Sequence, residues 1–212
     1  MTKSETAGRQ MDVLAIGLFG LAVGALTVGM TPVGQIPEVN KAGMLVVALV
    51  FGGLVQVLAG IAGIRYHEQL GETALTMYGF FWLTVSLAQL VSLGTTFHLD
   101  GTRFVPINLV YVFFSVVMLY LTAYRSVASS LLHDTITLTF ISTVCMRLNL
   151  ISEMLPGLAL LAVGTLAFYH TIGSLSQAYT EKTIVPLGPP LLQHVRVRAT
   201  VPWAAVGSHG GI

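Results

Sequence analysis

The chain contains few charged residues. Only 9% of its 212 residues are Asp, Glu, Lys or Arg, and 54% are hydrophobic, whereas a soluble domain has about 25% charged residues. Because so few charges cannot cover a water-facing surface, lipid is the expected solvent of this protein. The formal net charge of +1 also gives no electrostatic basis for binding nucleic acid.

Cysteine and metal-ligand patterns are scarce as well. Cys145 is the only cysteine, which excludes an internal disulfide, and a thiol among apolar residues is most often a packing residue. The six histidines lack the spacing of a metal site, and no nucleotide-binding fingerprint occurs. The sequence therefore predicts no catalytic residues, no metal, no cofactor and no enzymatic activity.

Six apolar segments approach the roughly 20 residues that a helix needs to cross a bilayer. They cover residues 13–30, 44–64, 74–93, 106–125, 135–151 and 156–176. The fifth segment is the weakest because it carries several hydroxyl residues. We predict an all-α integral membrane protein whose six transmembrane helices form one domain, residues 13–176. A polar N-terminal tail, 1–12, precedes it, and a C-terminal tail, 177–212, follows, largely irregular after residue 188.

The distribution of positive charge predicts the orientation. With an even number of spans, both termini lie on one side of the membrane. That side carries seven basic residues and the other side three: Lys3, Arg9, Arg65, Arg125, Lys182, Arg196 and Arg198 against Lys41, Arg103 and Arg147. Because cytoplasmic loops carry the excess of Lys and Arg, we predict a multi-pass protein of the plasma membrane with both termini in the cytoplasm.

Small residues recur on one helix face of each of the first two segments. They are Gly17, Gly20 and Gly24, then Gly53, Gly60 and Gly63, with Gln56 on the face of the second group. Small residues let membrane helices approach closely, so we interpret the glycines as packing residues. The amide of Gln56 would be unpaired in lipid. Either it bonds to another helix or it faces a water-filled lumen.

The third segment begins with aromatic residues. Tyr78 and Trp82 are one helical turn apart, with Ser86 and Gln89 on roughly the same side. Aromatic residues near a helix end are commonly interfacial anchors. From spacing alone, that is the favoured interpretation of this pair.

The block from Phe51 to Trp82 carries a family pattern, spread over the second and third segments without a gap. Its matching residues are Gly52, Gly53, Gln56, Ala59, Gly60, Gly71, Thr73, Tyr78, Gly79, Phe81 and Trp82. The block resembles the acetate uptake transporter family, the succinate–acetate permeases of bacteria and yeasts. The last segment is similar to the family as well, through residues such as Gly157 and Gly164.

The resemblance implies a homohexamer with a separate pathway inside each protomer. The expected function is a channel or proton-coupled transporter for acetate or a similar small monocarboxylate, with succinate as a further candidate. Tyr78 resembles part of a hydrophobic constriction, to which the first helix contributes a phenylalanine where this chain has Leu21 beside Phe19. The predicted pathway residues are Gln56, Tyr78, Leu21, Phe19 and Trp82, and Gly79 joins the predicted packing residues.

The chain departs from the family at two places. Of the first-helix signature only Gly17 and Leu18 are unchanged among Asp12 to Leu18, and Gly63 replaces a glutamate found in many relatives. These departures keep two alternatives open: a non-transporting sensor or assembly protein on the same scaffold, and a transporter of a different small solute. For Arg147, the alternatives are snorkelling to the outer interface and attracting anions.

Overall fold

The structure, a computed structural model, describes residues 13–34, 37–64, 69–94, 100–180 and 184–192. These residues form six long helices and no β-strand. Five of the helices are α1 (Val13–Gly29), α4 (Gln69–Gly94), α5 (Val105–Thr122), α6 (Val127–Arg147) and α7 (Met154–Thr180). The remaining one is a continuous rod of α2 (Lys41–Val47), η3 (Ala48–Val55) and α3 (Gln56–Gly63), and η2 (Glu38–Asn40) and η5 (Gly101–Phe104) are short 3₁₀ turns.

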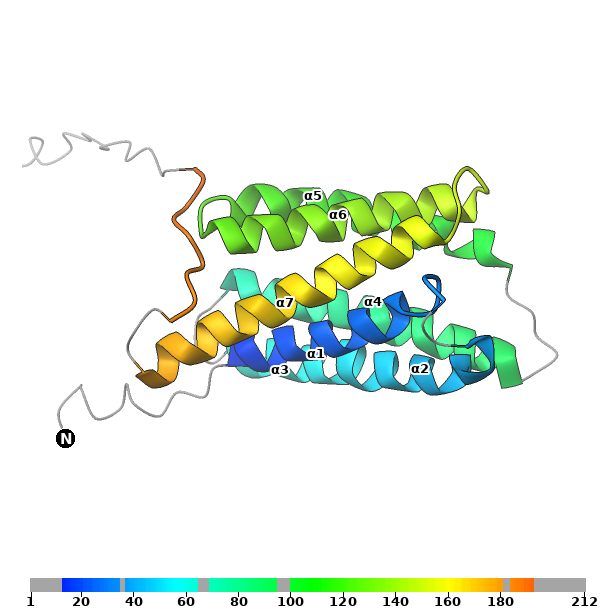
Figure 1. Ribbon diagram of the computed structural model, residues 1–212, viewed down its shortest axis with the longest axis horizontal. Helices are drawn as coiled ribbons and strands as arrows, with labels where there is room; N and C mark the ends of the chain where they lie inside the picture. The colour runs from blue at the N-terminus through cyan, green and yellow to red at the C-terminus, as the bar shows by residue number, and fades with distance from the viewer. Residues whose placement is uncertain (1–12, 35–36, 65–68, 95–99, 181–183, 193–212) are drawn as a thin grey trace, which may run out of the picture.

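The helices form a bundle of two parts joined by α7. Figure 1 shows α5 and α6 side by side, α1, α3 and α4 on the opposite side, and α7 running obliquely between them. In agreement, α5 packs on α6, α3 on α4, and α7 on both α1 and α6. The start of α1 and the end of α7 lie at the same end of the bundle. We call this the terminal end and the opposite one the far end.

The six-helix fold agrees with the prediction, but the fifth helix occupies different residues. It begins at Val127 because the Ser126 hydroxyl accepts a hydrogen bond from the Ser129 N–H at 3.1 Å, as a helix cap does. It ends at Arg147, and Asn149 adopts a left-handed φ of 58°. The amides of Asn149 and Leu150 then donate to carbonyls of the last turn, as in a Schellman motif. The predicted range 135–151 therefore starts too late and ends too late.

Four helices are long and apolar enough to cross a membrane by length and composition: Lys41–Gly63, Leu70–Gly94, Gly101–Thr122 and Met154–Thr180. The apolar helix α1 is shorter, with 17 residues. In α6, Thr135, Thr137 and Thr139 each donate a hydrogen bond to the carbonyl four residues earlier. These bonds satisfy the hydroxyl groups within the helix, which makes a polar sequence compatible with a membrane.

Glycines allow α1, α4 and the rod formed by α2, η3 and α3 to approach one another closely. A Cβ atom added to Gly24 would lie 3.0 Å from Cα of Gly52, and one added to Gly53 would lie 2.6 Å from the Leu83 side chain. At Gly79 the added atom would lie 2.9 Å from the backbone nitrogen of Val57. Gly20 and Gly60 likewise have no room for a larger side chain, because an added Cβ would meet backbone atoms, and Gly17 packs directly against the Leu75 side chain. Close backbone contact replaces the hydrophobic driving force that helices lack in lipid.

The middle part of the α2–η3–α3 rod is a π-helix. η3 covers eight residues, Ala48–Val55, and ends where Gln56 begins α3. The side-chain amide of Gln56 donates a hydrogen bond of 2.6 Å to the carbonyl of Gly52, inside the π-helical stretch. π-Helical insertions in α-helices are rare and are frequently found at functional sites. Here the irregular turn lies beside Gln56 and against α4.

The segment after α7 covers the beginning of α6. The first amides of α6, at Val127 and Ala128, donate to the carbonyls of Pro189 and Leu187 at 3.0 and 2.9 Å. The Tyr169 hydroxyl donates to the Pro186 carbonyl at 2.6 Å. The first amides of a helix have no partner within it, so this non-helical segment completes the start of α6. α7 itself continues to Thr180, past the expected end of the membrane domain at residue 176.

The close contact at Gly24 generates a test of the packing. Replacing Gly24 with Leu forces side-chain atoms against the backbone of Gly52 and should lower the stability by about 1–3 kcal/mol, as overpacking does. Gly43→Leu is the matched control, because an added Cβ there meets no atom within 4 Å. Thermal unfolding in detergent measures both variants. Equal unfolding temperatures for the two would contradict the packing assigned to Gly24.

Candidate functional site

Two cavities lie along the inside of the bundle. The larger has a volume of 260 Å³ and is lined towards the far end by residues such as Lys41, Phe104 and Arg147. The smaller has a volume of 50 Å³ and is lined towards the terminal end by residues such as Leu14 and Thr122. Together they lie in line between the two ends of the bundle.

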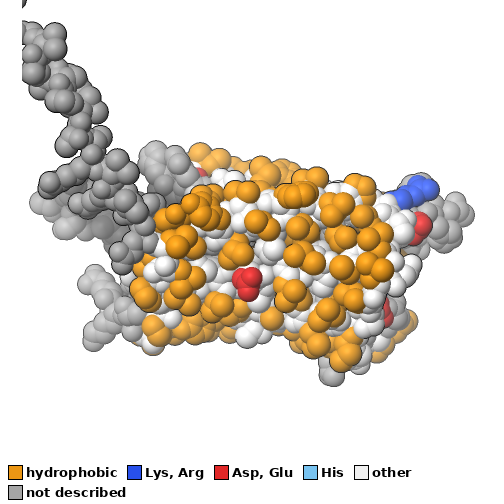
Figure 2. Space-filling model, turned by 90° about the horizontal axis from the view of Figure 1, so that it is seen from above, with side chains coloured by type: hydrophobic (Ala, Val, Ile, Leu, Met, Phe, Trp, Pro, Cys, Tyr) orange, Lys and Arg blue, Asp and Glu red, His pale blue; other side chains and the backbone are white. Residues whose placement is uncertain are grey.

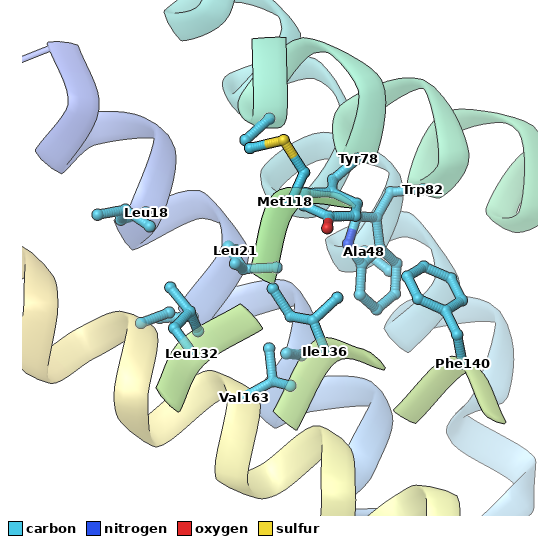
Figure 3. Packing of buried hydrophobic residues seen from close by; sticks show 14 residues of the cluster. Leu18, Leu21, Ala48, Tyr78, Trp82, Met118, Leu132, Ile136, Phe140 and Val163 are labelled. Atoms are coloured by element: carbon cyan, nitrogen blue, oxygen red, sulfur yellow. The ribbon is translucent and has the colours of Figure 1, made fainter. Parts of the chain in front are cut away.

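Three residues line both cavities: Leu21 of α1, Tyr78 of α4 and Ile136 of α6. Their exposed fractions are 5%, 4% and 5%. Figure 3 shows these side chains converging from their three helices. We call them the collar. The collar therefore separates two wider spaces with two aliphatic side chains and one aromatic side chain.

The ring of Tyr78 is held by other aromatic rings. Its centroid lies 5.2 Å from that of Phe114 in an edge arrangement and 6.2 Å from those of Tyr111 and Phe140. Tyr111 is itself anchored, because its hydroxyl donates to the Met77 carbonyl at 2.7 Å. Such aromatic pairs fix ring orientation and each contribute about 0.5–1.5 kcal/mol. The Tyr78 hydroxyl is buried without a hydrogen-bond partner among the described residues.

The larger cavity has polar groups on a mostly apolar wall. Trp82, Ser86 and Gln89 line it from α4, and Asn108 lines it from α5. The Asn108 amide donates to the Phe104 carbonyl at 2.6 Å, while its side-chain oxygen has no partner among the described residues. An unpaired buried polar group costs about 1–3 kcal/mol. Water or a polar solute in the cavity can remove that cost.

Charged residues gather where the larger cavity reaches the far end. Lys41, Arg147 and Glu153 line it there. The guanidinium of Arg147 lies 5.5 Å from the centre of the Phe104 ring, within cation–π range. Nearby, hydrogen bonds from the Thr102 backbone and side chain lower the pKa of Asp100, with smaller contributions from Arg103 and Arg147. Arg147, for which snorkelling and the attraction of anions are the two alternatives, thus lies at the mouth of the larger cavity.

The smaller cavity contains Gln56 and His133, both buried. Gln56 donates to the Gly52 carbonyl, and its side-chain oxygen has no partner among the described residues. His133 Nδ1 lies 2.9 Å from the Ser129 carbonyl oxygen, and its Nε2 has no partner in the described part of the chain. His170 also lines the cavity, with Nε2 at 2.9 Å from the Ser129 hydroxyl.

The structure brings most of the predicted pathway residues together. Leu21 and Tyr78 lie in the collar, Trp82 lines the larger cavity and Gln56 the smaller one. Phe19 lies elsewhere: it is 43% exposed, lines neither cavity, and has its ring 6.4 Å from that of Phe168.

The two departures from the family have different structural outcomes. Asp12 falls outside the described residues. A Cβ atom added at Gly63 would lie 2.6 Å from Cγ of Glu72, so the buried Glu72 side chain fills the space beside this glycine. The acidic group at this contact therefore belongs to α4 and not to α3.

Of α6, sequence reasoning weighed only Arg147 and named none of the lining residues that precede it. His133, Ile136, Phe140, Thr143 and Arg147 follow one another at helical spacing and all line one of the cavities. A stripe that mixes apolar, hydroxyl and cationic residues along one helix face was the available signal. No group of three or more His, Cys, Asp or Glu side chains that could hold a metal ion occurs among the described residues.

Comparison with known proteins identifies the fold. The profile of the GPR1/FUN34/yaaH family matches residues 3–189. The chain belongs to this family. The family indicated by the Phe51–Trp82 block is thereby confirmed. A solved structure described as the bacterial acetate channel SatP has a TM-score of 0.75 and 22% sequence identity, and covers 85% of this chain and 100% of that chain. Comparison with curated protein sequences yields no match.

The fold and the family establish this member of the GPR1/FUN34/yaaH family as a multi-pass membrane protein. Four of its helices can span a membrane by their own composition. In such a protein, polar groups on an internal cavity mark a water-accessible path, because they would be costly against lipid. The two cavities and the collar are therefore the candidate functional site.

Water access to the larger cavity can be tested with introduced cysteines. In a Cys145→Ala background, Gln89→Cys places a thiol in the cavity, whereas Leu87→Cys places one on the outer face of α4, where Leu87 is 55% exposed. Because thiolate forms readily only in a wet environment, a membrane-impermeant thiosulfonate should modify the first at least about tenfold faster. Equal rates in intact membranes would contradict a water-filled larger cavity.

Proposed function

We propose that each protomer is a channel for acetate or a similar small monocarboxylate. The observation that carries this proposal is the pair of cavities that meet at the collar of Leu21, Tyr78 and Ile136. The solved structure with the same fold is described as a bacterial acetate channel, which supports the substrate class. Passage runs from the far end through the larger cavity, past the collar and through the smaller cavity.

The collar supplies selection by size and by wetting. Its three side chains are nearly fully buried, and a narrow apolar ring excludes hydrated ions because it dewets. The Tyr78 hydroxyl, which has no partner among the described residues, offers a passing carboxyl group one hydrogen bond. The methyl group of acetate is compatible with the aliphatic surfaces of Leu21 and Ile136.

The charges at the far mouth supply attraction. Lys41 and Arg147 line the larger cavity together with the single acid Glu153. Field lines concentrate in clefts lined by one sign of charge, which raises the local concentration of an oppositely charged solute. The excess of basic residues therefore favours carboxylates at this mouth. With both termini in the cytoplasm of a plasma-membrane protein, as the basic residues indicate, this mouth faces the outside.

The polar lining argues for transport over a non-transporting scaffold. A sensor or assembly protein needs no polar group reachable from both ends. Tyr78 lines both cavities, and on either side of it Asn108 and Gln56 carry polar atoms that have no partner in the described part of the chain. This arrangement supports a path that a solute can follow through the protomer.

The outer surface supports assembly of several copies, with a hexamer as the expected number. Asp134 is exposed on α6, among exposed side chains such as Leu131 and Leu138. Figure 2, seen from above relative to Figure 1, shows a largely hydrophobic outer surface with few charged side chains. Asp134 lies about 10 Å along a helix of about 31 Å. Since a carboxylate exposed to lipid costs up to about 2.5–3.5 kcal/mol, the value for a helix centre, we propose that a second copy covers it.

Acetate flux tests the proposed channel. Liposomes containing the purified protein should take up radiolabelled acetate faster than empty liposomes. Ile136→Trp fills the collar and should reduce this flux about tenfold, which corresponds to about 1.4 kcal/mol of added barrier. Tyr78→Ala widens the collar and should admit bulkier monocarboxylates.

The flux experiment has a matched control on α4. Phe80→Trp adds the same bulky side chain on the outer face, where Phe80 is 49% exposed, and should leave flux unchanged. Elution as a single species shows that each variant folds. No flux above that of empty liposomes would overturn the proposed function.

The proposed assembly has its own test at Asp134. Asp134→Lys should break the contact between copies and lower the mass of the protein–detergent complex, because it reverses the charge in a buried site. Asp134→Asn keeps the size and hydrogen-bonding capacity and should preserve the assembly. Native mass spectrometry measures both variants. A monomeric wild-type protein would contradict this proposal.

A further inference from the structure

We propose, on the basis of the proposed function, that His133 selects the undissociated form of the carboxylic acid in the smaller cavity. In this arrangement His133 Nε2 accepts the hydrogen bond of the acid O–H group. The Tyr78 hydroxyl donates to the carbonyl oxygen of the same acid. The ligand class is therefore a short neutral carboxylic acid, and His133 is a specificity-determining residue of the path.

The hydrogen bonding of His133 determines what its ring offers. Nδ1 lies 2.9 Å from the Ser129 carbonyl oxygen. A carbonyl oxygen only accepts hydrogen bonds, so Nδ1 carries a proton and donates it. In the neutral ring Nε2 is then a lone-pair acceptor. It is buried with no partner among the described residues, and His133 itself is only 7% exposed.

The other unpaired atoms of the smaller cavity define what a ligand must bring. Gln56 presents a side-chain oxygen, an acceptor, and Tyr78 a hydroxyl, which both donates and accepts. A carboxylate brings only acceptors, so it could pair with Tyr78 but leaves Gln56 and His133 unsatisfied. An undissociated acid brings one donor as well. It can therefore pair with His133 and Tyr78 at once.

The size of the smaller cavity limits the ligand. Its 50 Å³ is room for about three to five water molecules, at roughly 10–15 Å³ for each. The rings of His133 and Tyr78 have centroids 6.0 Å apart, so both border the same small space. A carboxyl group with a short alkyl chain is compatible with that space, and the apolar wall includes Leu18 and Leu132.

The other charged and titratable groups around the smaller cavity do not take the role of His133 as acceptor for the acid O–H group. Tyr78 faces the cavity from α4, His170 from α7 and Arg125 from the connection between α5 and α6. His170 Nε2 is already within 2.9 Å of the Ser129 hydroxyl. Arg125 is exposed at the terminal end. From α1, α3 and α5 the described lining residues are uncharged.

On the other side of the collar, the side-chain oxygen of Asn108 also favours a solute that carries a hydrogen-bond donor. Asn108 lines the larger cavity, where its amide nitrogen donates to the Phe104 carbonyl and its side-chain oxygen has no partner within the described ranges. Neutral acceptors thus stand on both sides of the collar, whereas the Nε–H donor of Arg147, which also has no partner among the described residues, belongs to the basic far mouth of the larger cavity. Such a path satisfies a solute that carries a hydrogen-bond donor better than a bare carboxylate.

Two substitutions separate the roles of the two ring nitrogens. In His133→Asn the amide can replace Nδ1 but has no atom near the position of Nε2. In His133→Gln an amide oxygen can replace Nε2 as a neutral acceptor. We expect Asn to reduce the protein-dependent flux of radiolabelled acetate about tenfold and Gln to keep it within about threefold of wild type. Wild-type flux in the Asn variant would overturn the proposal.

Membrane potential provides the second readout. Undissociated acid carries no charge, so a potassium potential set with valinomycin should leave the initial flux unchanged, and lowering the pH should increase it at constant total acetate. Flux that follows the potential would show that the anion passes, which overturns the proposal while leaving the channel function intact. If the flux through the Gln variant no longer depended on pH, the proposal would also be overturned. The pH dependence of the wild type would then come from protonation of His133 and not from protonation of the acid.

Nitrogen NMR of ¹⁵N-histidine-labelled protein gives a readout that does not depend on flux. The resonance of His133 Nε2 is assigned by its absence from the spectrum of His133→Gln. Adding acetate at low pH should shift this resonance, and adding it at high pH should shift it much less. An unchanged resonance would overturn the proposal. Absence of flux in the wild type, with the resonance shift present, would instead contradict the proposed channel and leave the binding site.

Discussion

The structure depends on one constraint: a polar group inside a membrane protein needs a partner within the protein or in water that the protein encloses. The threonines of α6 satisfy it with carbonyls of their own helix. The first amides of α6 satisfy it with carbonyls of the segment after α7. Side-chain atoms without partners among the described residues therefore indicate where the protein encloses water or a solute. Those of Gln56, Tyr78, Asn108 and His133 border the two cavities.

The cavities follow from unequal helix spacing. Glycines bring α1, α4 and the α2–η3–α3 rod into backbone contact on one side of the bundle. On the other side, rings of α4, α5 and α6 stand between the helices: Phe81 lies 4.8 Å from Tyr111 and 4.9 Å from Phe140. Small residues thus fix one wall and large residues hold the opposite wall away from it. The space between them narrows at Tyr78, which both walls support.

The sequence contained much of this design, but not all of it. The glycine faces and the positions of Gln56, Tyr78 and Trp82 follow from periodicity and from the block shared with the family. The start of α6 was missed for two reasons. The Ser126 cap is a short local signal that was overlooked, and the first amides of the helix bond to Leu187 and Pro189, about 60 positions away, which local patterns cannot reveal. Ile136 and His133 were missed because an isoleucine and a lone histidine look ordinary until another helix faces them.

The distribution of charge explains why a neutral solute suits the interior. Among the described lining residues, Lys, Arg and Glu occur only at Lys41, Arg147 and Glu153 of the larger cavity and Arg125 of the smaller one. These lie towards the ends, where water is available. The collar has no fixed cation to offset the loss of water from a carboxylate, and burying an unpaired charge costs far more than burying a hydrogen-bonded neutral group. In the proposed channel, cations would therefore concentrate the anion at the mouths, while the protonation equilibrium would supply the acid for the interior.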